Sequence, residues 1–237
     1  MLTIKSSKLN INSGSKVLDM GCGEGRHTIS FNVFDNFNAF GFDISVNDLK
    51  KSRNKLKDFD TTSLSSKCYF GATDIHNLPF LDNTFDAVIC SEVLEHIVSV
   101  SDALAELVRV LKPNGVLGIS VPRFLPEWIC WKLSEGYQKM PGGHVRIFKQ
   151  NQLRILVEEE KVKYLSFHWA HALHSPYWWL QCLFWDTKEN SSLINVYHQF
   201  LVWDLMKKPL ITRILERVFQ PFIGKSLVMY FQKNPHD

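Results

Sequence analysis

Short apolar runs alternate with stretches of helical periodicity along most of the chain. Each run has five to seven residues, the length and composition of strands in a sheet that is covered on both faces. Between many of them, apolar residues recur every three or four positions, as on the buried side of an amphipathic helix. The runs predict seven strands, at residues 16–20, 39–43, 67–72, 85–91, 116–121, 163–169 and 226–232.

Four helices are predicted between these strands. The clearest carries leucines and valines at helical spacing up to Leu111, and Pro113-Asn114-Gly115 stop it. The alternation of strands and helices predicts an α/β fold: a Rossmann-like, seven-stranded, mostly parallel sheet with helices on both faces. The other three helices are predicted at residues 26–34, 46–57 and 149–160.

Two segments interrupt this alternation and carry much of the aromatic content. Residues 122–146 connect the fifth strand to the next helix, and the 55 residues 171–225 separate the last two strands. All seven tryptophans lie after residue 127. We therefore expect a core at 1–170 with 122–146 as a connecting lid, a helical, aromatic-rich cap at 171–225, and a last core strand with a tail at 226–237.

The composition limits the cellular compartment and the class of binding partner that we expect. The net charge of +3 is too small to indicate nucleic-acid binding by itself. The five cysteines contain no CxxC pair, and an odd number cannot pair completely, so a reduced, cytoplasmic setting is expected. Lysines interrupt the N-terminal stretch where a signal peptide would be apolar.

One stretch, residues 164–185, has no Asp, Glu, Lys or Arg over 22 residues, a length that could span a bilayer. It also contains three histidines, a proline and a glutamine, which suit lipid poorly. We interpret it as a buried strand, a turn and a helix, with packing or loop roles for the histidines. A basic amphipathic pattern at 210–219 leaves peripheral membrane contact open.

A glycine loop follows the first predicted strand directly. Glycines at alternate positions let the backbone turn sharply and approach a ligand, and the helix that follows points its free N–H groups at that ligand. This combination predicts a nucleotide-type pocket. The third glycine of a dinucleotide-binding GxGxxG loop is replaced by Arg26, which disfavours a nicotinamide dehydrogenase. The loop residues that we expect at the ligand are Gly21, Cys22, Gly23 and Gly25.

Polar residues stand at the ends of the other predicted strands. Asp43, followed by Ile44, ends the second strand, Asp74 and Ile75 follow the third, and Ser91 ends the fourth. Asp19 lies on the first strand, two positions before the loop. Because ligands in open α/β sheets bind beyond the carboxyl ends of the strands, these residues are expected at one site.

With these residues, the chain resembles the class I S-adenosylmethionine-dependent methyltransferases, specifically the type 11 (ubiquinone/menaquinone-biosynthesis-like) family. The resemblance implies S-adenosylmethionine as cofactor and methyl donor, and it implies a role for each acid. Asp43 would accept from the ribose hydroxyls, and Asp74 from the adenine amino group beside the N–H of Ile75. Asp19 would orient the methionine ammonium, and the backbone around Ser91 would close that end. The resemblance to this family rests on the segments VLDMGCGEG, GFDIS, ATDIHNLPF, FDAVICSEVLEHI and LVRVLKPNGVLGISVP.

Methyl transfer is an in-line displacement that mainly needs alignment and exclusion of water. A general base is required only when the acceptor must lose a proton, and His144 and His96 are the candidates. On a helical turn, Glu92, Glu95 and His96 would lie together and resemble the metal cluster of some methyltransferases. The same string is common in type 11 enzymes that have no known metal. A metal-assisted O-methyltransferase therefore stays an alternative, and no divalent metal is assigned.

The aromatic insertion predicts a small-molecule acceptor that is apolar, aromatic or lipid-like, methylated on oxygen or carbon. Nucleic acid is not expected, because Ser91-Glu92-Val93-Leu94 stands where base-amine methyltransferases carry Asp/Asn-Pro-Pro-Tyr. A protein that binds S-adenosylmethionine but has lost catalysis is the remaining alternative. The acceptor and the oligomeric state are not legible in the sequence.

Overall fold

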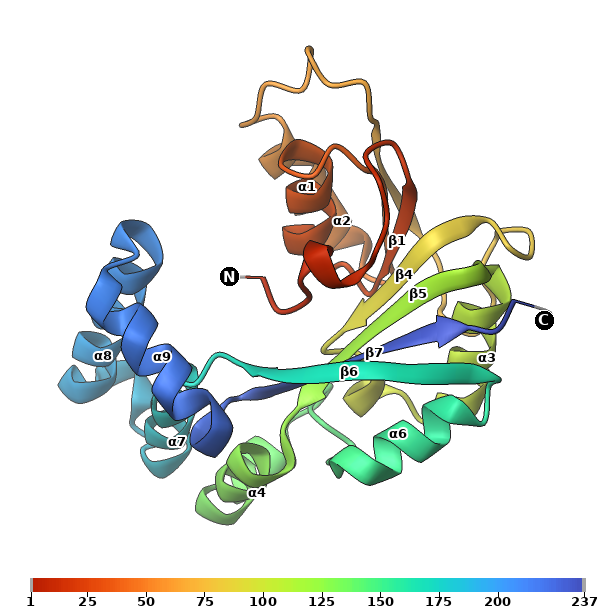
Figure 1. The fold of residues 1–237 in the computed structure, drawn as a ribbon. Helices are drawn as coiled ribbons and strands as arrows, with labels where there is room; N and C mark the ends of the chain where they lie inside the picture. The colour runs from red at the N-terminus through yellow and green to blue at the C-terminus, as the bar shows by residue number, and fades with distance from the viewer. Residues whose placement is uncertain (1, 236–237) are drawn as a thin grey trace.

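The computed structural model describes residues 2–235 and arranges seven strands in one sheet (Figure 1). Met1 and the last two residues of the predicted tail, 236–237, lie outside the described residues. The strand order is β3-β2-β1-β4-β5-β7-β6. The strands are β1 (Lys16–Met20), β2 (Asn38–Asp43), β3 (Cys68–Ala72), β4 (Phe85–Ser91), β5 (Leu111–Pro122), β6 (Val162–Ala170) and β7 (Ser226–Lys233).

All strands but β7 run in the same direction. β7 lies between β5 and β6 and is antiparallel to both. The predicted Rossmann-like, mostly parallel sheet is therefore confirmed. The chain leaves β1 towards β2 and β3 on one side and returns to β4 and β5 on the other, so β1 and β4 mark the switch point where such sheets bind ligands.

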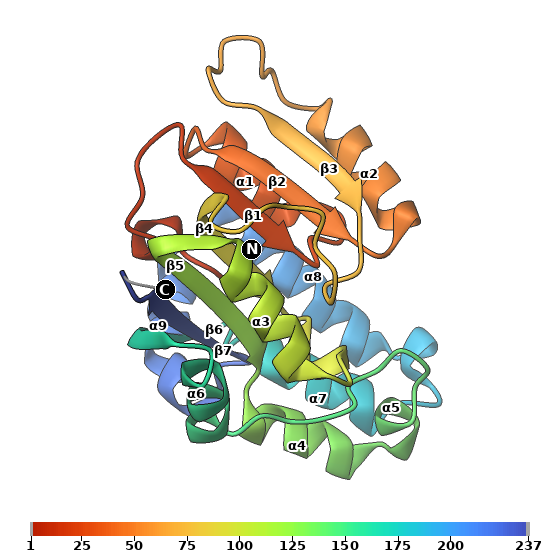
Figure 2. The same ribbon diagram turned by 90° about the vertical axis from the view of Figure 1, so that its right-hand side faces the viewer.

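Helices cover both faces of the sheet, as predicted; Figure 2 shows α3 in front of the strands. On one face the strands pack against leucines of α3 and α6, and on the other against Phe31 of α1 and the N-terminal segment. The core helices are α1 (Arg26–Val33), α2 (Val46–Leu56), α3 (Val100–Val110) and α6 (Gln150–Glu158).

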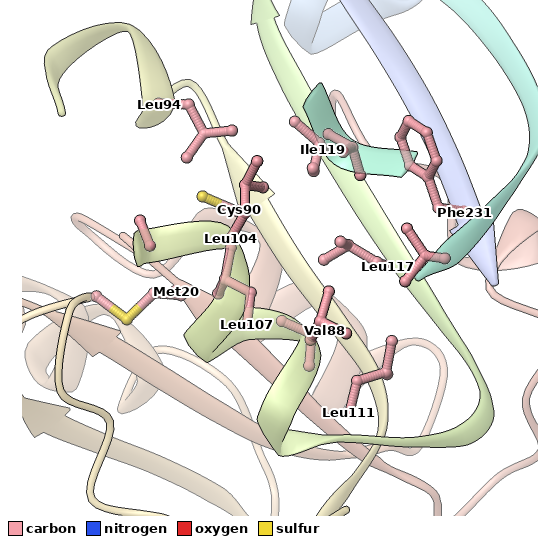
Figure 3. Close-up of a cluster of buried hydrophobic side chains, with 14 of the residues drawn as sticks. Met20, Val88, Cys90, Leu94, Leu104, Leu107, Leu111, Leu117, Ile119 and Phe231 are labelled. Carbon is pink, nitrogen blue, oxygen red and sulfur yellow. The ribbon is translucent and has the colours of Figure 1, made fainter. Parts of the chain in front are cut away.

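Successive side chains along a strand point to opposite faces of the sheet, so the core consists of a cluster on each face. Val88 and Cys90 of β4 contribute to the cluster that contains Leu104 and Leu107 of α3, shown in Figure 3. Ile89, between them in sequence, belongs to the cluster on the opposite face. Each fully buried leucine or isoleucine stabilises the fold by roughly 1.5–3 kcal/mol, so this double-sided burial holds the strand ends in register.

Two local predictions were wrong. Leu111 was expected on the helix, but α3 ends at Val110 and Leu111 begins β5, opposite Phe85 and before a bulge. The helix cannot continue through Lys112, because Pro113 restricts the residue before it to extended backbone. The strand expected at 163–169 was thought to be buried; β6 is instead the edge strand, with an alternating burial pattern.

The insertion between β6 and β7 is helical, as predicted, and stands beside the end of the sheet (Figure 1). It comprises α7 (His174–Leu183), the 3₁₀ turn Lys188–Asn190, α8 (Ser192–Lys207) and α9 (Leu210–Ile223). Among residues 2–235, no helix is long and apolar enough to cross a membrane.

The segment 122–146 forms α4 (Phe124–Leu133) and α5 (Glu135–Gln138), and α4 packs against α7. Cys130, Tyr137 and Cys182 are buried together there, with four tryptophans around them: Trp131, Trp178, Trp179 and Trp185. The aromatic residues of the two irregular segments therefore pack against one another in a cluster of their own.

Candidate active site

The glycine loop is held against β2 by its own backbone. Gly21, Gly23 and Gly25 all have positive φ, at 76°, 51° and 79°. The N–H groups of Gly21 and Cys22 both donate to the carbonyl of Phe42, at 2.7 and 3.0 Å. A Cβ on Gly21 would come within 2.2 Å of the Val93 side chain, so only glycine fits this turn.

Asp43, at the end of β2, joins the loop to the next helix. Its Oδ2 accepts from the N–H of Gly23 at 2.7 Å, and its Oδ1 accepts from the N–H of Ser45, the N-cap of α2, at 2.8 Å. The residue is only half-buried, and each carboxylate oxygen can accept a further bond. Ile44, next to it, is 74% exposed and adds an apolar surface at the same edge.

Asp19 is buried and bonded within the protein. Its Oδ2 accepts from the N–H of Thr28 at 3.0 Å and from the Thr28 hydroxyl at 2.6 Å, which ties β1 to the first turn of α1. Burial raises the pKa of Asp19 to about 6. The expected contact of Asp19 with a methionine ammonium stays a prediction.

An Asp19→Asn protein is expected to lose a pH dependence of stability. Because the folded pKa of about 6 lies above the ordinary value of 3.8, the folded state holds this proton more tightly. The stabilisation is complete below pH ~4 and is lost as the pH rises to ~6, a change of about 3 kcal/mol. Urea unfolding of both proteins from pH 4 to 7 measures the difference. Parallel curves would mean that Asp19 is not protonated in this range.

The carboxyl ends of β3, β4 and β5 lie at the same edge of the sheet as the glycine loop. Asp43 lies opposite Ala72 of β3, and Ser91 opposite Ser120 of β5, with their hydroxyls 2.9 Å apart. Asp74, two residues beyond β3, is exposed; its Oδ1 accepts from the N–H of His76 at 3.0 Å and lies 2.8 Å from His76 Nδ1, which lowers its pKa.

Two of the other predicted residues are buried there. Ile75 is buried, and its N–H role towards an adenine stays a prediction. Burial raises the pKa of the Cys22 thiol well above its ordinary value, so this cysteine fills space in the loop and carries no thiolate chemistry.

A cavity of about 380 Å³ lies beside the glycine loop. Its polar wall comes from Arg26 at the start of α1, Glu92 after β4 and Lys225 before β7. Tyr177 and Trp178 of α7 supply its aromatic wall. Three apolar residues of α8 complete it on the insertion side: Leu201, Val202 and Leu205.

Residues 18–119 match the family model described as "Methyltransferase domain". This part of the chain is similar in sequence to a methyltransferase domain. The predicted resemblance is thereby confirmed for the region that contains the glycine loop, Asp43, Asp74 and Ser91. The family implies S-adenosylmethionine as the methyl donor. The loop fits that donor, because a Cβ on Gly23 would meet no atom within 4 Å, so the backbone there is open to a ligand.

Named relatives of the methyltransferase domain act on different acceptors. The chain is 33% identical over 141 residues to sterol 24-C-methyltransferase erg6 of Schizosaccharomyces pombe, covering 59% of this chain and 34% of that protein. It is 38% identical over 112 residues to demethylmenaquinone methyltransferase of Staphylococcus saprophyticus, covering 46% of each. The chain thus spans about a third to a half of the length of these relatives.

Solved structures extend the likeness in fold to the whole chain. A SAM-dependent methyltransferase from Methanosarcina mazei superposes with a TM-score of 0.65 at 14% identity, over 98% of this chain and 99% of that one. The [4+2]-cyclase SpnF gives 0.64 at 18% identity, over 97% and 78%. Two different activities share the fold, so the acceptor chemistry has to be argued from the site.

The histidines predicted as bases lie outside this cavity, next to Glu95. His96 and His144 face each other with ring centroids 4.9 Å apart, and neither lines the 380 Å³ cavity. Their roles as general bases stay predictions. Burial raises the pKa of Glu95 well above its ordinary value.

The grouping of Glu92 with Glu95 and His96 was wrong. Glu92 has a φ of 59° and lies outside the short 3₁₀ turn η2 (Leu94–His96), so no helical turn brings the three together. Its Oε1 accepts from the Ser120 hydroxyl at 2.9 Å, and its side chain lines the cavity. The residue that joins Glu95 and His96 is His144, from the segment 122–146.

Sequence reasoning missed the polar residues of the cavity. Arg26 was considered only as a replacement for a glycine, and Lys225 only as the end of an insertion. Thr3, near the N-terminus, also lines the cavity and accepts from the Arg26 guanidinium at 3.2 Å. The sequence around Thr3 has apolar residues at Leu2 and Ile4, but this segment is too short for a periodic pattern that would have predicted its place.

Proposed function

We propose that the protein is an S-adenosylmethionine-dependent methyltransferase that acts on a small, apolar or aromatic acceptor carrying an acidic group. One observation carries the proposal. The cavity beside the glycine loop has a wall of aromatic and aliphatic side chains from the insertion, and two cationic groups, Arg26 from the core and Lys225 from the end of the insertion. The insertion 171–225 thereby serves as the cap over the acceptor.

Two cationic groups in the cavity are the reason for proposing an acidic group on the acceptor. Within residues 2–235, neither Arg26 nor Lys225 forms an ion pair with a carboxylate at 4 Å or less. Burial lowers the pKa of Arg26, but a guanidinium stays charged in proteins. With Glu92 as the one acid of the lining, the cavity has an excess of positive charge, which favours a bound carboxylate or phosphate.

The apolar wall of the cavity is the reason for proposing that the body of the acceptor is apolar or aromatic. Tyr177 and Trp178 present ring faces and edges, and the Lys225 ammonium lies 5.3 Å from the ring centroid of Trp178. Pockets of this size and lining bind the body of a ring or an isoprenoid by burying its surface, while a few polar groups fix its orientation.

The bound donor supplies an electrophilic methyl group, and this chain positions the acceptor and keeps water away. Such alignment lowers the barrier by several kcal/mol without a catalytic base. For a hydroxyl acceptor, His174 and His198 are the imidazoles that line the cavity. Burial lowers the pKa of His174, which keeps that ring neutral and able to accept a proton.

The insertion also presents apolar side chains to solvent. Leu210 and Phe222 of α9 are 76% and 66% exposed, and Met206 of α8 is 74% exposed. Lys207 and Arg213 lie among them in sequence. We include peripheral contact with an anionic membrane in the proposal, as a source of lipid-like acceptors.

The test uses purified protein, methyl-labelled donor and acceptor pairs that differ only in a free acid against its methyl ester. The acid should be preferred by at least about tenfold in kcat/KM, equivalent to roughly 1.4 kcal/mol. Lys225→Met should remove most of that preference through KM. Lys163→Met, an exposed lysine of β6 away from the cavity, is the matched control.

Each other outcome has a meaning. Equal use of acid and ester overturns the acidic acceptor. Binding of S-adenosylhomocysteine without turnover of any acceptor supports the inactive binding protein. Lipid acceptors are offered both in anionic vesicles and in detergent micelles, and equal rates in the two would remove the membrane from the proposal.

A further inference from the structure

Three side chains outside the 380 Å³ cavity converge on one point, and one of them is a buried carboxylate. Glu95 Oε1 lies 3.9 Å from His96 Nε2 and 4.0 Å from His144 Nε2. Glu95 is 1% exposed, and within residues 2–235 neither of its carboxylate oxygens has a hydrogen-bond partner. A buried carboxylate without a partner is costly unless a cation or a proton compensates it.

The two histidines are held in the tautomer that leaves Nε2 without a hydrogen. His144 Nδ1 lies 2.6 Å from Oε1 of Glu127, on α4, and His96 Nδ1 lies 3.1 Å from the carbonyl of Gly143. Both partners accept hydrogen bonds, so both Nδ1 atoms carry the hydrogen. In the neutral imidazoles the lone pairs of both Nε2 atoms therefore point towards the Glu95 carboxylate, and three acceptors surround the same space.

We propose that Glu95, His96 and His144 bind a divalent transition-metal ion, with Glu127 orienting His144. Two imidazoles and a carboxylate are a donor set for zinc, manganese, iron or cobalt rather than for calcium or magnesium. A carboxylate behind a metal-binding histidine is the usual outer support of such sites. The three donor atoms all lie within 4.8 Å of one another.

The distances favour a metal over a shared proton. A proton on Glu95 would be donated to an imidazole at about 2.6–3.2 Å, much shorter than the observed 3.9 and 4.0 Å. Bonds of about 2.0–2.2 Å to a tetrahedral ion place neighbouring donors roughly 3.4 Å apart. The two pairs that include Glu95 thus need to approach by about half an ångström, and the whole donor set, which lies within 4.8 Å, by up to about 1.4 Å, which small side-chain rotations can supply.

The ion would fasten the lid to the core. Glu95 and His96 come from the turn after β4, whereas His144 and Glu127 come from the segment 122–146. Backbone bonds already join the two, since Val145 N–H donates to the carbonyl of Glu95 at 2.9 Å. This inference does not rest on the proposed methyl transfer, because the site is defined by its own donors.

The experiment measures metal binding to the whole, untagged chain after treatment with a chelator. Titration with Co²⁺ should reach one equivalent and give the visible absorption of histidine-bound cobalt. Saturating Zn²⁺ or Mn²⁺ should raise Tm by roughly 5–10 °C. Glu95→Gln and His144→Ala should each weaken Co²⁺ binding more than about 100-fold, since loss of an outer support alone costs 10–100-fold. Glu92→Gln, the neighbouring acid outside the set, should bind Co²⁺ normally.

Two results would overturn the site. If the wild type takes up no Co²⁺ and Glu95→Gln keeps its Tm, a proton occupies the space, because the amide mimics a protonated Glu95. If Glu92→Gln loses the metal as well, the donor set is different from the one proposed. Should His144→Ala fail to fold, Glu127→Gln provides the second variant, with an expected loss of about 10–100-fold in affinity.

Discussion

A Gly21→Ala protein is expected to bind S-adenosylhomocysteine at least about 100-fold more weakly than the wild type, equivalent to about 3 kcal/mol. The new Cβ would lie 2.2 Å from Cγ2 of Val93, and the φ of 76° is unfavourable for alanine. The backbone has to move away, which breaks the 2.7 Å bond from the Gly21 N–H to the Phe42 carbonyl. The loop then no longer lies against β2, and isothermal titration calorimetry measures the loss.

Gly14→Ala is the matched control for this prediction. Gly14 has a φ of 84°, and a Cβ there would meet no atom within 4 Å. The substitution therefore has the same backbone cost of about 1 kcal/mol but no clash, and it lies outside the loop. Its affinity should stay within about twofold of the wild type. Equal losses in both proteins would show that backbone strain, and not the fit against Val93, controls binding.

The edge of the sheet where the cofactor is expected could be predicted from the sequence because its determinants are local. An apolar run followed at once by glycines fixes a strand and a turn within ten residues, and parallel strands bring their carboxyl ends to one edge. Asp43 and Ser91 therefore lie where their positions at strand ends placed them. Asp19 shows the limit of such reasoning, since its bonds to Thr28 depend on the direction in which α1 leaves the loop.

The acceptor side and the Glu95 cluster could not be predicted in the same way. Arg26, Thr3 and Lys225 meet in space from segments separated by up to 222 residues, and no period links them. The link between His144 and Glu127 crosses a lid whose path no pattern reveals. The spacing of Glu92, Glu95 and His96 predicted a helical turn, but the left-handed backbone of Glu92 interrupts it.

Asp43→Asn is the second substitution with a large expected effect, a loss of about 30-fold in affinity for S-adenosylhomocysteine, equivalent to about 2 kcal/mol. The carboxylate accepts from the Gly23 N–H at 2.7 Å and from the Ser45 N–H at 2.8 Å. An amide has one accepting oxygen, so its NH₂ group would face one of these N–H donors. The charge-assisted bonds expected to the ribose hydroxyls would also be lost.

A control variant distinguishes a loss of cofactor contacts in Asp43→Asn from general destabilisation of the fold. Asp48→Asn, on the exposed side of α2, removes one negative charge five residues away and only disturbs the exposed pair with Lys51 at 3.3 Å. Its affinity should therefore be unchanged, because exposed pairs of this kind contribute about 0–1 kcal/mol. Thermal unfolding of each unliganded protein shows whether the fold is intact. An Asp43→Asn protein that folds and binds as tightly as the wild type would remove Asp43 from the cofactor site, leaving it only the task of joining the glycine loop to α2.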